Sequence, residues 1–169
     1  LVRRWRKEAR QTQERFVIVA NTTFRIALWS DALFAIDREW WQTYGDEVNA
    51  NFAGRKLSTN SIDLRFNVTK LPKVRSYANS GAGAISAAVH AGAKRVILLG
   101  FDCQKTGGKS HWHGDHPKHL GNAGRIEAWH DEFLKLKNDF AHVEIVNATR
   151  ETALECFDRI TLEAALCRI

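Results

Sequence analysis

Two segments of this chain carry side chains whose types and spacing suit chemistry at a binding site. The first begins at Asn79, Ser80 and Gly81, continues through an alanine-rich helical stretch and an apolar strand, and ends at Asp102. Asn79 and Ser80 can cap the helix, and the N–H groups of its first turn favour an anion such as a phosphate. Asp102 is expected at the carboxyl end of the strand, where open parallel sheets bind their ligands. We therefore predict that all four residues bind a nucleotide; ordinary helix capping is the alternative interpretation.

The second segment is a histidine-bearing loop with the sequence His111-Trp112-His113-Gly114-Asp115-His116-Pro117. Its His-x-His-x-Asp-His string matches the zinc-binding pattern of metallo-β-lactamase-type hydrolases, in which the ligands would be His111, His113, Asp115 and His116. In those enzymes the histidines directly follow a strand, whereas a loop that contains glycine and lysine precedes them here. Downstream ligands are also hard to find, because His130 lies inside a predicted helix.

An imidazole close to the strand-end carboxylate offers a different use of the same loop, as a general base or acid near neutral pH. We favour this interpretation, with His113, His116 and Asp102 as the catalytic residues and no metal required. An inert loop that covers the sheet, and incidental metal binding, stay open as alternatives. Lysines at positions 105, 109 and 118 would draw phosphate oxygens to the same place.

Two other apolar runs also end in polar side chains. Residues 16–20 are followed by Asn21, and residues 32–36 are followed by Asp37. Continuous apolar runs of this length are typical of strands buried on both faces of a parallel sheet. Because the carboxyl ends of parallel strands lie at one edge of a sheet, we expect Asn21, Asp37 and Asp102 to converge there and bind a nucleotide.

The elements that must position these residues alternate between strand and helix. Strands are predicted over 16–20, 32–36, 95–99 and 143–146, with shorter candidates at 55–57 and 62–68. Helices are predicted up to residue 10, over 38–44 with an end at Gly45, from residue 80 to a break at Gly92, and over 125–140 and 160–168. This order predicts an α/β fold, a three-layer, doubly wound, mostly parallel Rossmann-like sheet with right-handed crossovers.

Composition limits the classes of protein to which the chain can belong. At 169 residues with 44% hydrophobic content, it is long enough for a single domain with its own core, spanning residues 1–169. No apolar run reaches the roughly 20 residues needed to cross a bilayer, and the first residues lack the apolar core of a signal peptide. We therefore expect a cytoplasmic protein with no membrane partner. Three widely spaced cysteines fit reduced thiols.

The formal net charge of +6 favours an anionic small-molecule ligand. Basic residues crowd the N-terminal segment, at Arg3, Arg4, Arg6, Lys7, Arg10 and Arg15. We interpret this cluster as a solvated helix face. Nucleic acid is the less favoured partner, because the aromatic residues follow no RNA-binding signature. A homo-oligomer is left open.

Taken in order, these motifs resemble a known group of proteins. The order is a strand ending at Asn21, a strand ending at Asp37 with an aromatic helix after it, Asn79-Ser80-Gly81, Gly100-Phe101-Asp102, and the histidine loop. Over roughly residues 16–150, the chain resembles the bacterial sialyltransferases of glycosyltransferase family 42 and the related pterin diphosphokinase-like proteins. It is most closely similar to small phage proteins that carry the Asn-Ser-Gly, Gly-Phe-Asp and His-Trp-His-Gly-Asp-His-Pro strings.

The resemblance implies a metal-independent, glycosyltransferase-like enzyme, phage-encoded and acting in the host cytoplasm, that needs no cofactor and uses a nucleotide or nucleotide-sugar as donor. In the sialyltransferases, a cytidine nucleotide is lined by the residues that match Asn21, Asp37, Ser80, Gly81 and Asp102. A histidine of the following loop acts there as base on the acceptor hydroxyl, which implies His113 or His116 here. Hydrogen bonds and helix dipoles would stabilise the leaving nucleotide.

The chain departs from the family at two places. The family begins with a strand and a glycine-rich phosphate loop, whereas residues 1–5 here resemble the helix that follows this loop. We therefore expect a version shortened at its N-terminus, either because the given sequence begins after the first strand or because the protein itself is shorter. The tyrosines that hold the leaving phosphate in the family are replaced by Cys103, Gln104, Lys105 and Thr106, so the identities of donor and acceptor do not transfer. A non-catalytic phage accessory protein is the alternative from another class.

Overall fold

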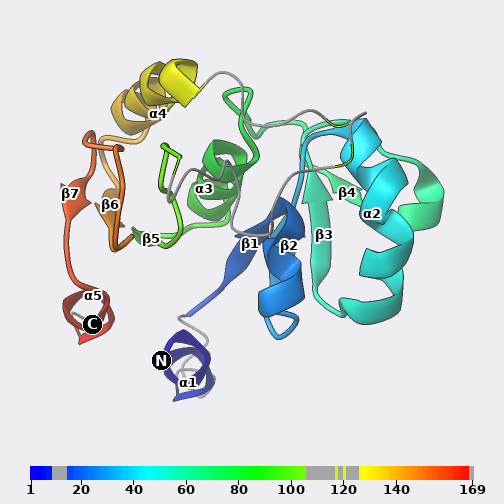
Figure 1. The fold of residues 1–169 in the computed structure, drawn as a ribbon, viewed down its shortest axis with the longest axis horizontal. Helices are drawn as coiled ribbons and strands as arrows, with labels where there is room; N and C mark the ends of the chain where they lie inside the picture. The colour runs from blue at the N-terminus through cyan, green and yellow to red at the C-terminus, as the bar shows by residue number, and fades with distance from the viewer. Residues whose placement is uncertain (9–14, 106–116, 118–119, 121–125, 168–169) are drawn as a thin grey trace. The chain divides into compact units, whose positions relative to one another are not determined.

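The structure is a computed structural model that describes residues 1–8, 15–105, 117, 120 and 126–167. Contacts divide the chain into two compact units, Leu1–Ala87 and Ala88–Ile169 (Figure 1). Each unit contains a parallel sheet with flanking helices, so the predicted α/β class is confirmed. Within the described residues, the strands form two hydrogen-bonded sheets, one of four strands and one of three. A single domain, and one doubly wound sheet in three layers, stay predictions.

The first unit is built on parallel strands in the order β1-β2-β3-β4. These strands are β1 (Ile18–Ala20), β2 (Ala32–Phe34), β3 (Arg55–Ser58) and β4 (Thr69–Lys70). The helices are α1 (Val2–Glu8), the 3-10 helix η2 (Asn21–Ile26), α2 (Arg38–Asn51), the 3-10 helix η3 (Leu64–Phe66) and α3 (Ser80–His90), of which the first part belongs to this unit. All three residues of β2 are fully buried, as expected for a strand with parallel neighbours on both sides.

Helix α2 continues to Asn51, so the predicted end at Gly45 is wrong. Gly45 is buried within the helix, and a Cβ at this position would lie 2.3 Å from the ring of Phe66. The glycine therefore permits a close contact with a packed ring. In the sequence, this glycine suggested a helix end. In the structure, its lack of a side chain makes room for the Phe66 ring instead.

The predicted strand over residues 62–68 is also wrong. The Asp63 carboxylate accepts a hydrogen bond from the backbone N–H of Arg65 at 3.0 Å, which starts the short helix η3. Asn67 then takes a left-handed backbone conformation with φ of 52° and ends it. The strand β4 begins only after this turn, because local side-chain hydrogen bonds compete with the extended conformation.

Helix α3 packs on the sheet through its small residues. A Cβ at Gly83 would lie 2.4 Å from the ring of Phe34 on β2, so only glycine permits this approach. Ala84 and Ala87 complete a buried cluster with Phe34. The alanine-rich sequence that predicted the helix therefore also sets its distance from the sheet.

The second unit contains parallel strands in the order β5-β6-β7. Its elements are β5 (Arg95–Leu98), α4 (Ile126–Asp139), β6 (Glu144–Asn147), β7 (Asp158–Arg159) and α5 (Leu162–Cys167). The sequence predicted all of these except β7, to within a few residues at their ends. Leu98, Phe133, Leu136 and Phe157 are buried in its core. No helix among the described residues of the chain is long and apolar enough to cross a membrane.

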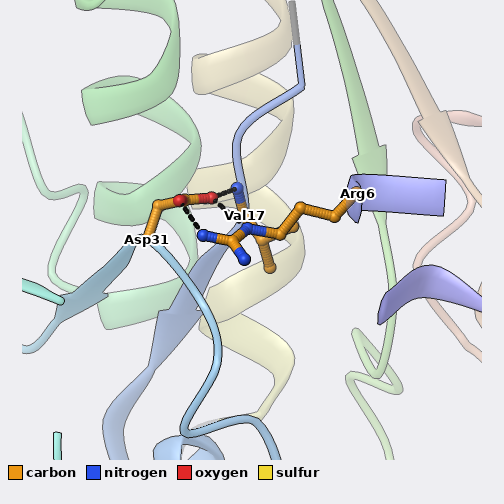
Figure 2. A network of polar contacts seen from close by, with 3 residues as sticks. All are labelled: Arg6, Val17 and Asp31. Atoms are coloured by element: carbon orange, nitrogen blue, oxygen red, sulfur yellow. Dashed lines mark hydrogen bonds and ion pairs between the residues drawn. The ribbon is translucent and has the colours of Figure 1, made fainter. Parts of the chain in front are cut away.

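Asp31 is bonded to three other segments of the first unit, and Figure 2 shows its contacts with two of them, Arg6 and Val17. Its carboxylate forms a two-pronged ion pair with the buried Arg6 of α1, with the Arg6 Nε atom 2.8 Å from Oδ2, and also accepts a hydrogen bond from the N–H of Val17 at 2.8 Å. Its backbone N–H donates to the carbonyl of Val17, and its carbonyl accepts from the N–H of Arg55. Arg6 therefore does not belong to a solvated face, whereas Arg3, Arg4 and Lys7 are exposed, as the sequence predicted.

Removing the Asp31 carboxylate is expected to destabilise the protein strongly. Asp31→Ala leaves a buried guanidinium without its anion and removes the acceptor of the Val17 N–H. We expect the free energy of unfolding to fall by about 3 kcal/mol, at the lower end for broken buried pairs, because the Asp31 side chain keeps 20% exposure. Urea denaturation of the full chain measures this change.

Glu8→Ala is the matched control, because it breaks the exposed Arg4–Glu8 ion pair of α1, the helix to which Arg6 also belongs. Its expected cost is below about 1 kcal/mol. Equal losses in the two variants would show that Asp31 does not connect these segments as described.

Candidate functional site

The carboxyl edge of the β1–β4 sheet holds five of the predicted site residues. Ala20 of β1 pairs in parallel with Phe34 of β2, so the residues that follow these two strands emerge at one edge. Asn21 follows β1 directly, and Asp37 precedes the first residue of α2. The other three, Asn79, Ser80 and Gly81, form the beginning of α3.

A hydrogen bond connects α3 to the end of β2. The backbone N–H of Ile36, the residue before Asp37, donates to the Ser80 hydroxyl oxygen at 3.3 Å. Ser80 is buried, and the close contact of Gly83 with Phe34 holds the helix at this distance. The structure thus brings Ser80 to the strand end that carries Asp37.

Asn60 is a residue of this edge that the sequence analysis did not identify. It follows β3, and its side-chain amide donates to the carbonyl oxygen of Ile36 at 2.8 Å. Both backbone polar groups of Ile36 are therefore bonded to side chains from other segments. A polar residue after a third strand was the available signal, but the third strand was too short and polar to suggest a buried strand end.

Asn79 caps α3 in the ordinary way. Its Oδ1 atom accepts from the N–H of Ala82 at 3.1 Å, and its carbonyl oxygen accepts from the N–H of Gly83 at 2.9 Å. The side chain is thus committed to the helix, as the alternative interpretation held. The N–H groups of Ser80 and Gly81 precede the intrahelical ladder and are the first-turn donors suited to an anion.

The backbone at this edge is strained in two places. Asn21 has a left-handed φ of 48°, and within the described residues its buried Oδ1 atom has no hydrogen-bond partner. Tyr77 and Ala78, just before the α3 cap, both have φ of 52°, and the guanidinium of Arg75 lies 4.6 Å from the Tyr77 ring centroid. Non-glycine residues adopt such angles at a cost, and such residues cluster at ligand sites.

The Asp37 carboxylate makes no capping hydrogen bond to α2. Although the residue reaches solvent, the protein around it partly desolvates the carboxylate, which raises its pKa above the usual range; the charge of Glu39 raises the pKa further. A backbone hydrogen bond at Asp37 opposes this shift. The Asp37 carboxylate is therefore a hydrogen-bond acceptor whose ionised form is less stable than usual. A hydrogen-bond donor on a ligand would suit it.

In the second unit, Asp102 lies in the loop after β5. Its carbonyl oxygen accepts from the N–H of Ala153 at 2.8 Å. The preceding residue, Phe101, donates its N–H to the Thr149 hydroxyl at 3.0 Å, and its carbonyl accepts from the Thr152 hydroxyl at 2.6 Å. Neither threonine was a predicted site residue.

Cys103 follows Asp102 in a left-handed conformation with φ of 47° and is buried. Burial, with smaller contributions from the nearby Cys156 and Asp102, raises the pKa of the Cys103 thiol to about 12. This thiol is therefore not a nucleophile near neutral pH.

The histidine loop lies outside the described residues, so the predicted roles of His111, His113, Asp115 and His116 stay predictions. Among the residues that are described, no three His, Cys, Asp or Glu side chains come together as a metal site. A hollow of about 370 Å³ beside β6 and β7 is lined by none of the predicted site residues.

Comparison with protein-family models, curated proteins and solved structures gives no match.

The raised pKa of Asp37 makes a testable contribution to stability. A carboxylate whose folded-state pKa is raised destabilises the folded protein as the pH rises above the pKa of the unfolded state. Asp37→Asn is therefore expected to increase the free energy of unfolding at pH 7, and this gain should vanish near about pH 3, where aspartate is protonated in both states. Urea denaturation at the two pH values provides the measurement.

Asp46→Asn, at an exposed position of α2, the helix that Asp37 precedes, is the control for loss of a negative charge. It should change the stability less than Asp37→Asn at pH 7. If Asp37→Asn is less stable than the parent protein at pH 7, the ionised Asp37 carboxylate does not destabilise the folded state.

Proposed function

We propose that the chain binds a nucleotide or nucleotide-sugar at the carboxyl edge of the β1–β4 sheet and transfers a group from it. The observation that carries the proposal is the Ile36–Ser80 hydrogen bond, which joins the start of α3 to the strand end beside Asp37. Helix N–H donors suit a phosphate, and a carboxylate acceptor suits the hydroxyls of a ribose. Both kinds of group meet at this edge.

Asn21 supports the same proposal. Its Oδ1 atom is buried with no hydrogen-bond partner among the described residues, although buried polar atoms are normally bonded. A donor on a bound ligand, or an ordered water that the ligand replaces, would satisfy it. The left-handed conformation of Asn21 is also of the kind found at ligand sites.

The transfer step rests on the resemblance to family 42 glycosyltransferases. The acceptor hydroxyl attacks the donor carbon, the bond from that carbon to the phosphate oxygen breaks, and the hydroxyl proton moves to the imidazole of His113 or His116. N–H donors stabilise the charge on the leaving phosphate, so the step requires no metal. The same resemblance implies a nucleotide-binding role for Asp102. The free thiols suit a cytoplasmic setting.

Nucleotide binding is the first test. Calorimetric titration of the full chain with nucleoside mono- and diphosphates and with nucleotide-sugars should give saturable binding by at least one of them. Asp37→Ala should weaken that binding by roughly tenfold, the loss expected for one hydrogen bond to a charged group. Asp46→Ala, on the exposed face of the same helix, should bind as the parent does. Absence of binding to the whole panel, by a chain that carries its natural N-terminus, would favour the non-catalytic accessory protein.

The histidine loop separates two reaction classes. For a general base, one of the two variants His113→Ala and His116→Ala should lower turnover of the bound nucleotide-sugar by roughly 10²–10⁴-fold. The other variant, like His111→Ala, should have a smaller effect. Chelator should then change neither turnover nor melting temperature. Stoichiometric zinc in the purified protein, together with loss of activity in each of the His111, His113, Asp115 and His116 variants, would identify a metal-dependent hydrolase instead.

A further inference from the structure

The two aspartates that follow strands β2 and β5 share a backbone arrangement. In each case, the residue immediately before the aspartate has both its N–H and its carbonyl bonded to side chains from distant segments. Ile36 precedes Asp37 and is bonded to Ser80 and Asn60. Phe101 precedes Asp102 and is bonded to Thr149 and Thr152. We call these two sets of bonds the Ile36 clamp and the Phe101 clamp.

We propose that Asn60, Thr149 and Thr152 are positioning residues. Asn60, together with Ser80, fixes the backbone of Asp37, and the two threonines fix the backbone of Asp102, each aspartate in the orientation that presents it to a ligand. This proposal rests on the proposed function and adds residues that no motif of the sequence indicated. Each clamp acts within its own unit.

The Ile36 clamp holds the peptide plane that leads into Asp37. The β-ladder of β2 ends at Phe34, so the polar groups of Ile36 lie beyond it and must find other partners. Ser80 binds the N–H at 3.3 Å from one side, and Asn60 binds the carbonyl at 2.8 Å from another. The carbonyl of Ile36 and the N–H of Asp37 belong to one planar peptide group, so its rotation is opposed directly.

The Phe101 clamp is the more strongly connected of the two. Thr152 also accepts from the N–H of Leu154 at 3.0 Å, and the N–H of Thr149 donates to the buried Asn147 at 3.1 Å. The carbonyl of Asp102 is itself bonded to Ala153. The clamp therefore ties the Asp102 loop to the chain that follows β6, through two hydroxyl groups supported by buried neighbours.

Fixed backbones lower the cost of binding. A carboxylate on a mobile loop loses conformational freedom when a ligand binds, whereas a carboxylate whose backbone is already held loses less. Removal of a clamp should therefore weaken ligand binding even though none of the three clamp residues is required to touch the ligand. A role in folding alone would leave the affinity of the folded fraction unchanged.

The test uses a matched set of variants of the full chain. Thr149→Val and Thr152→Val keep the side-chain shape and remove the hydroxyl, and Thr149→Ser and Thr152→Ser restore it. Asn60→Ala removes the other clamp, and Ser61→Ala, which alters the neighbouring exposed residue bonded to Lys70, is its control. If one threonine variant fails to fold, the other tests the same clamp.

The first readout needs no ligand. Backbone ¹⁵N relaxation should give rigid order parameters near about 0.85 for Asp37 and Asp102 in the parent. Asn60→Ala should lower the value at Asp37 only, and each Thr→Val variant should lower it at Asp102 only. Unchanged order parameters in the folded variants would overturn the proposal.

The second readout is the dissociation constant for the nucleotide that the parent binds, cytidine 5′-monophosphate being the first probe. Each clamp-breaking variant should weaken binding roughly tenfold, and each Thr→Ser variant should restore it. Mobile aspartates with unchanged affinity would overturn the positioning role. If the parent binds no nucleotide, the proposed function fails on its own, and the order parameters still decide whether the clamps hold the aspartates.

Discussion

Helix α3 lies so close to β2 that no side chain larger than hydrogen fits at Gly83, and the candidate site of the first unit depends on this contact. A Cβ at Gly83 would lie 2.4 Å from the Phe34 ring. At this separation the Ser80 hydroxyl reaches the N–H of Ile36, and the first-turn N–H groups of α3 lie at the same sheet edge as Asp37. A wider spacing would leave the helix and the strand end as separate features, with no shared place for a ligand.

Several features of the two sheet ends reduce stability and are compatible with ligand binding. Asn21, Tyr77, Ala78 and Cys103 hold left-handed conformations, and partial desolvation together with the charge of Glu39 disfavours the ionised form of Asp37. Unfavourable conformations of this kind persist where the surrounding packing and hydrogen bonds hold the backbone in place. The Asp31–Arg6 ion pair and the buried aromatic residues of the first unit provide that rigidity away from the site.

The sequence predicted the elements whose patterns are local. The apolar runs of β1, β2, β5 and β6 were visible because the strands of parallel sheets tend to be continuously hydrophobic in sequence. Asn79 at the start of α3 is a local cap. Gly45 was misinterpreted because its reason is a contact with Phe66, which is distant in the sequence. Asn60, Thr149 and Thr152 were missed for a related reason: their roles depend on which strand end each reaches, and short polar residues in loops are common everywhere.

Amide chemical-shift mapping would show whether the carboxyl edge of the β1–β4 sheet binds a phosphate-bearing ligand, as we propose. Cytidine 5′-monophosphate, and then the other nucleoside monophosphates, would be titrated into the ¹⁵N-labelled full chain. We expect saturable shifts concentrated at Asn21, Asp37, Ser80 and Gly81. Saturable shifts confined to other surfaces, such as the exposed basic residues of α1, would show that the ligand binds elsewhere.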